Sequence, residues 1–91
     1  MLKTVSIIVT GKVQGVYYRQ STKEKARELN ITGEVYNLSD GSVKIVATGM
    51  GEQIEQLIQW CRVGPRRAIV DKIEVTEMLL QSFHGFDITR H

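Results

Sequence analysis

A short glycine-bearing segment leads directly into a helix at an arginine, and this combination is suited to binding an anion. Residues 11–18 carry Gly11 and Gly15 without a steady hydrophobic period, which predicts a loop. Gly15 lets the backbone bend without a Cβ in the way, so that successive N–H groups can turn towards one point. Arg19 follows at the predicted start of the helix, where its planar guanidinium can make two parallel hydrogen bonds to phosphate oxygens.

The pattern therefore predicts a phosphate site built from backbone donors and one guanidinium, with no metal. It is not a Walker loop, because no Gly-Lys-Ser/Thr sequence ends it. The plain alternative is a connecting loop followed by a solvated arginine. A cation is mildly unfavourable at the N-terminus of a helix unless an anion binds there, and this favours the phosphate site.

Hydrophobic periodicity predicts the elements that must hold this loop. Helices are expected over residues 19–30 and 54–61, and strands over 5–10, 31–38, 43–47, 69–76 and 86–88. This order predicts an α+β fold, a ferredoxin-like α/β sandwich of βαββαβ form with a short additional C-terminal strand. Both helices should cover one face of a mostly antiparallel sheet, and 91 residues suit a single domain over 1–91.

Asn37 lies near the end of the second predicted strand. The helical crossover between the first two strands makes them run parallel, so their C-terminal ends lie at one edge of the sheet. We therefore expect Asn37 to lie near the glycine-bearing loop. Its carboxamide could orient a water molecule, because the carbonyl accepts a hydrogen bond and the NH₂ group donates one.

Residues 11–19 read Gly-Lys-Val-Gln-Gly-Val-Tyr-Tyr-Arg, which closely resembles the signature of the acylphosphatase family. A second stretch, from Gly33 through Asn37 to Gly49, resembles that family's second signature. The resemblance extends more loosely through Gly64-Pro65 to Phe86-Asp87-Ile88 and covers essentially the whole chain.

This resemblance implies an enzyme that hydrolyses small-molecule acyl phosphates to a carboxylate and inorganic phosphate, without a metal or an organic cofactor. Arg19 matches the family's phosphate-binding arginine, and Asn37 matches the asparagine that positions the attacking water. The implied phosphate cradle is the backbone of Gln14, Gly15, Val16, Tyr17, Tyr18 and Arg19.

Several positions depart from the family's pattern. Tyr17 and Tyr18 add hydroxyl groups to the loop, Glu34 stands where an aromatic residue is usual, and Tyr36 where a basic or small residue is usual. Strand alternation puts Glu34 and Tyr36 on the face opposite Asn37. The single cysteine, Cys61, completes the hydrophobic stripe of the second helix and is expected to be a buried thiol.

Composition narrows the remaining classes of function. A net charge of +2 gives no support for nucleic-acid binding, no segment has the length of a membrane span, and a lone thiol suits a soluble cytoplasmic protein. The small size allows a monomer, which we expect. His84 and His91 lie near a C-terminus that we expect to be frayed, outside the site.

Three alternatives to an enzyme stay open. The same architecture hosts RNA-binding modules, which carry aromatic residues in the middle of strands one and three, where this chain has Ile7 and Ile45. A metal-carrying module would require paired cysteines in the first loop, and there are none. A catalytically silent phosphate-binding relative is the third alternative, although the presence of both Arg19 and Asn37 argues against it.

Overall fold

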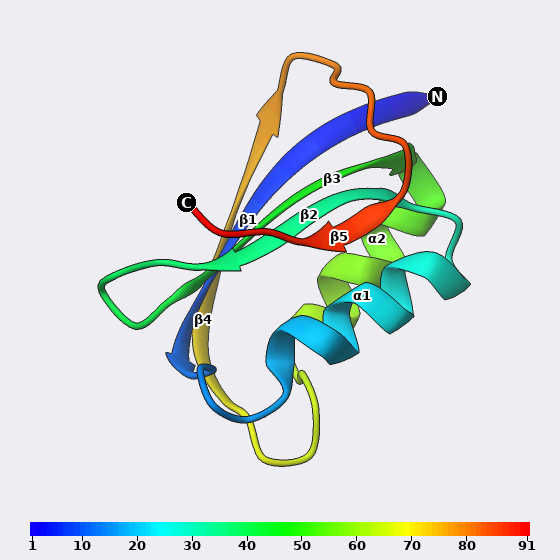
Figure 1. Cartoon of the computed structure of the whole chain (residues 1–91). Helices are drawn as coiled ribbons and strands as arrows, with labels where there is room; N and C mark the ends of the chain where they lie inside the picture. The colour runs from blue at the N-terminus through cyan, green and yellow to red at the C-terminus, as the bar shows by residue number, and fades with distance from the viewer.

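The computed structural model describes all residues, 1–91. Five strands form one sheet in the order β4-β1-β3-β2-β5, and both helices cover the same face of it (Figure 1). Each helix has only 11 residues, and neither is long and apolar enough to cross a membrane. The elements are β1 (Leu2–Lys12), α1 (Tyr18–Glu28), β2 (Thr32–Asn37), β3 (Val43–Met50), α2 (Gly51–Cys61), β4 (Ile69–Met78) and β5 (Phe86–Ile88).

The strand pairing confirms the predicted ferredoxin-like α+β fold. β1 is antiparallel to both β3 and β4, and β2 is antiparallel to β3, so that β1 and β2 run parallel with β3 between them. The short β5 pairs in parallel with the outer side of β2. The C-terminal ends of β1 and β2 therefore lie at the same edge of the sheet.

The core forms where the hydrophobic faces of the strands meet the hydrophobic stripes of the helices. Ile7, Val35 and Ile45 are fully buried on the face of the sheet that the helices cover. Helix α2 contributes the predicted stripe at i, i+3, i+4 and i+7, which is buried throughout: Ile54, Leu57, Ile58 and Cys61. This packing fixes the strand ends that carry the loop and Asn37.

The first strand is longer than its periodicity indicated, because it continues through Gly11 and Lys12. The pairing with β4 shifts register between Thr10 and Gly11, which is a β-bulge. A Cβ at Gly11 would lie 2.1 Å from the carbonyl oxygen of Ile69. The expectation that Gly11 opens the loop is therefore wrong. This glycine allows the close approach of β4, and the loop begins at Val13.

The other face of the sheet is partly covered at the opposite end of the strands. The hydroxyls of Thr4 and Thr48, which are partners across β1 and β3, lie 2.6 Å apart. Gln81 in the β4–β5 connection donates its backbone N–H to the Thr4 hydroxyl and accepts a bond from Thr48. These bonds hold the connection that crosses the sheet from β4 at one edge to β5 at the other (Figure 1).

Candidate active site

The loop from Val13 to Tyr17 presents free backbone donors. Gly15 and Tyr17 have positive φ, 74° and 68°, so left-handed and ordinary backbone conformations alternate along the loop. None of the backbone N–H groups from Gln14 to Tyr17 donates a hydrogen bond within the protein. Alternation of this kind produces the concave groups of N–H donors that bind anions.

A pocket of about 200 Å³ lies over this loop and the first turn of α1. Four of the residues predicted to form the phosphate cradle line it together with Arg19, whereas the side chain of Val16 is buried in the core. Tyr17 is 65% exposed beside the pocket. The lining residues are Val13, Gln14, Gly15, Tyr17, Tyr18, Arg19, Gln20 and Ile88.

Arg19 has no anionic partner within the protein. It takes part in none of the four ion pairs and in no side-chain hydrogen bond, and the first turn of α1 contains no acidic residue. Tyr17 precedes the helix without any side-chain cap. The N–H groups of the helix start and the nearby guanidinium together produce positive potential in the pocket, which suits a phosphate.

The side chain of Gln14 fastens the loop to the β2–β3 hairpin. Its Nε2 donates hydrogen bonds to the carbonyl oxygens of Leu38, at 2.8 Å, and Ser42, at 2.9 Å. The turn itself is closed by Asp40, whose carboxylate accepts bonds from the N–H and hydroxyl of Ser42, and these bonds lower the pKa of Asp40. Gln14 thereby fixes the loop relative to Asn37, which directly precedes the turn of the hairpin.

Replacing Gln14 with leucine removes both of these bonds, and we expect the free energy of unfolding to fall by about 1–2 kcal/mol. Because the loop is then less well positioned, inhibition by inorganic phosphate should also weaken. Urea denaturation and phosphate inhibition measure the two effects. Gln59→Leu is the matched control, since Gln59 is exposed on α2 and bonds only to Glu55. Equal stability of the two variants would contradict the anchoring role of Gln14.

Asn37 is the last residue of β2 and lines a second pocket, of about 310 Å³, together with Arg19. The structure thus brings together the two side chains predicted for catalysis, which lie 18 positions apart in the sequence. The Oδ1 atom of Asn37 is buried and accepts no hydrogen bond. A buried acceptor without a donor is costly, so this oxygen is suited to a hydrogen bond from a bound water molecule.

The side chain of Tyr18 packs into the core next to the loop. Its ring is buried against Trp60, with 5.6 Å between ring centroids, and its hydroxyl donates a bond of 2.8 Å to the carbonyl oxygen of Cys61. Burial raises the pKa of Tyr18 and raises that of the Cys61 thiol to about 12. Cys61 therefore remains a neutral, buried thiol, as predicted, and Tyr18 joins the start of α1 to the end of α2.

The C-terminal segment is part of the second pocket, and the expectation of a frayed C-terminus is wrong. Thr89, Arg90 and His91 line this pocket with Arg19 and Asn37. The backbone N–H of Thr89 donates a bond of 3.0 Å to the carbonyl of Val35, extending the pairing beyond β5. The alternation of Phe86 and Ile88 was the signal in the sequence that could have placed residue 90 near the site, because the same alternation continued puts residue 90 on the same side of the strand.

Comparisons with known proteins agree with the fold and with the family that the sequence resembles. A family model described as Acylphosphatase matches residues 5–88. An acylphosphatase of Marinobacter nauticus is 52% identical over 84 residues, 91% of each chain, and one of Methylococcus capsulatus is 49% identical over 90 residues, 98% of each chain. The solved structure of an acylphosphatase from Coxiella burnetii has a TM-score of 0.94 and 38% identity, and the match covers 97% of this chain and 93% of that one. This chain belongs to the acylphosphatase family.

Proposed function

We propose that this protein hydrolyses acyl phosphates, with the phosphoryl group held by the loop and Arg19 and the attacking water positioned by Asn37. Membership of the family makes the chain a hydrolase that acts on acid anhydrides. The observation that carries the proposed roles is that Arg19 lines both pockets, next to free backbone donors on one side and next to the unpartnered Oδ1 of Asn37 on the other.

This arrangement matches what the reaction requires. The water oxygen attacks phosphorus in line, the bond from phosphorus to the acyl oxygen breaks, and the carboxylate leaves with the electron pair. A carboxylate is stable as an anion at neutral pH, so no strong general acid is needed. The site has to neutralise the charge on the phosphoryl oxygens and to hold water opposite the leaving group. The guanidinium and the loop N–H groups provide the first function, and Asn37 provides the second.

The proton of the attacking water goes to a phosphoryl oxygen of the substrate. The carboxamide of Asn37 is not a useful base, and no aspartate or glutamate lines either pocket. Besides the arginines and the loop tyrosines, the only titratable residue that lines either pocket is His91. Its ring centroid lies 4.0 Å from that of Tyr36, and its Nε2 lies 3.4 Å from the carboxylate of Glu34.

We expect His91→Gln to keep the shape of the pH profile of kcat/KM for acetyl phosphate, because the substrate itself accepts the proton. Initial rates between pH 4 and pH 9 measure this profile. Loss of a single ionisation from the profile of this variant would instead identify His91 as the base and would overturn the substrate-assisted step.

The release of inorganic phosphate from acetyl phosphate, with and without a chelator, tests the proposed function directly. Turnover that is equal in both arms supports a reaction carried by the protein's own groups. If the protein binds inorganic phosphate but releases none from acetyl phosphate, it is the catalytically silent relative, and the proposed hydrolysis is wrong.

A further inference from the structure

A second arginine lines the Arg19–Asn37 pocket. Arg90 lies in this pocket, and like Arg19 it takes part in none of the four ion pairs of the fold. Two guanidinium groups without carboxylate partners repel each other across a shared pocket of about 310 Å³. Such an arrangement is stabilised by a ligand that carries more than one negative charge.

The position of Arg90 follows from the pairing of β5 with β2. The parallel register runs from Gly33–Phe86 to Val35–Ile88, where β5 ends, and the same register continued for two residues beyond β5 would bring Arg90 opposite Asn37. Phe86 is buried in the core and Ile88 packs against it, and the same alternation continued past β5 puts the exposed Arg90 on the side that α1 covers. Arg90 and Asn37 therefore share this face.

Residues on either side of Arg90 are fastened to the opposite face of β2. The Thr89 hydroxyl donates a bond of 3.2 Å to Glu34, and the ring of His91 lies against Tyr36 and near the same carboxylate. Glu34 and Tyr36 are two of the positions that depart from the family's pattern. Their contacts hold the backbone on either side of Arg90, whose own side chain is exposed and has no ion pair.

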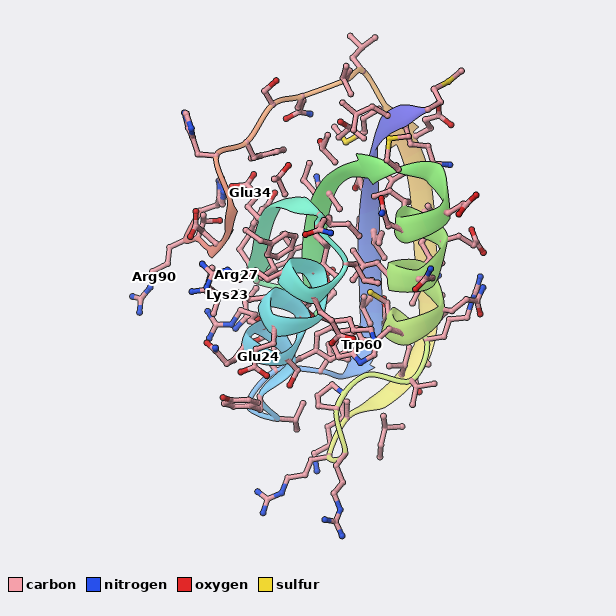
Figure 2. All side chains as sticks on the ribbon, turned by 90° about the vertical axis from the view of Figure 1, so that its right-hand side faces the viewer. Lys23, Glu24, Arg27, Glu34, Trp60 and Arg90 are labelled. Atoms are coloured by element: carbon pink, nitrogen blue, oxygen red, sulfur yellow. The ribbon has the colours of Figure 1, made fainter.

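The edge of the molecule leading to Arg90 carries charges of both signs, because Glu24 and Glu34 lie on this side as well (Figure 2). Figure 2 shows Lys23 and Arg27 of α1 on the same side of the molecule as Arg90. Arg27 is 3.9 Å from Asp87, whereas Lys23 has no ion pair.

We propose that Arg90 is a specificity-determining residue that binds a free carboxylate at the far end of the substrate's acyl chain. The proposal rests on the proposed function, because Arg19 and the loop hold the phosphoryl group while Arg90 holds the other end. The substrate class is thus the monoacyl phosphates of dicarboxylic acids. The guanidinium fork of Arg90 matches a carboxylate through two parallel hydrogen bonds.

A matched pair of substrates tests the proposal, since butyryl phosphate and succinyl phosphate differ mainly by a methyl group in place of a carboxylate. In the unmodified protein, kcat/KM should be about tenfold higher for succinyl phosphate, the low end expected for a hydrogen bond to a charged group. Arg90→Gln should reduce this ratio to about one, and Arg90→Lys should retain part of it. Lys72→Gln is the control, because it removes one exposed charge from β4 at the opposite edge of the sheet.

Each other outcome overturns the proposal in a recognisable way. If Arg90→Gln lowers kcat/KM equally for both substrates and weakens inhibition by inorganic phosphate, Arg90 binds the phosphoryl group instead. If Lys72→Gln reduces the ratio as much as Arg90→Gln, the preference comes from net charge alone. A failure of the proposed function is distinguishable from both, because neither substrate would then be hydrolysed.

Discussion

Replacing Arg19 with alanine is expected to lower kcat/KM for acetyl phosphate by about 10³-fold, the loss seen when a phosphoryl group loses a positioned charge. Arg19 is the one cationic side chain that lines the pocket over the loop, so its loss leaves only backbone N–H groups there to oppose the charge on the phosphoryl oxygens. Binding and turnover should fall together, and the inhibition constant of inorganic phosphate should rise by about 100-fold.

Two further variants separate the role of Arg19 from a loss of folding or of general charge. Arg19 makes no ion pair and no side-chain hydrogen bond, so the urea midpoint of Arg19→Ala should stay close to that of the unmodified protein. Arg62→Ala removes an exposed, unpaired guanidinium at the end of α2 and should retain full activity. Unchanged inhibition by phosphate in Arg19→Ala would contradict the assignment.

Replacing Asn37 with alanine should lower kcat by about 10²-fold to 10³-fold, while the inhibition constant of inorganic phosphate changes by less than about threefold. The reason is that Asn37 interacts with the attacking water and not with the phosphoryl group. Its Oδ1 is buried without a donor, so the variant loses no hydrogen bond within the protein. Stability should consequently remain within about 1 kcal/mol of the original, as measured in urea.

The change in kcat and the change in the inhibition constant of phosphate together decide the role of Asn37. If Asn37→Ala weakens phosphate inhibition as strongly as Arg19→Ala does, then Asn37 belongs to the anion cradle. If Asn37→Ala keeps full activity, water is positioned by another group and the assigned role is wrong. Asn37→Asp adds a second comparison, because a carboxylate near the phosphoryl oxygens should raise KM through repulsion.

The sequence was sufficient to predict the fold because each element carries its own periodicity. The alternation of Ile7 and Val9 and the stripe from Ile54 to Cys61 both lie where predicted, in the buried layer between sheet and helices. The ends of the helices and strands were harder to predict. Gly11 was interpreted as the start of a loop, whereas a bulge lets β1 continue for two residues beside β4. Such a bulge depends on the partner strand, which local periodicity does not report.

The site was predictable as far as local signals and parallel strands allowed. The glycine-bearing loop and Asn37 were brought to one edge by the first crossover alone, and Arg19 and Asn37 do share a pocket. Their roles in binding and in water positioning stay predictions. The place of Arg90 in this pocket was not predicted, since it depends on the parallel pairing of a three-residue strand with β2. The hydrogen bonds of Gln14 to the hairpin likewise depend on contacts across 24 and 28 positions.

The position of β1 between β3 and β4 also has a kinetic consequence. Val5 pairs with Ala47 on one side and with Glu77 on the other, so most of the chain must be closed into loops before these contacts form. Closing these loops costs entropy before the strand pairing can offset that cost. Refolding is therefore slower than in proteins built from local contacts. The loop before Arg19 begins where β1 ends, so it takes its place beside the β2–β3 hairpin once β1 has paired. The return of catalysis after dilution from denaturant should therefore report the final step of refolding.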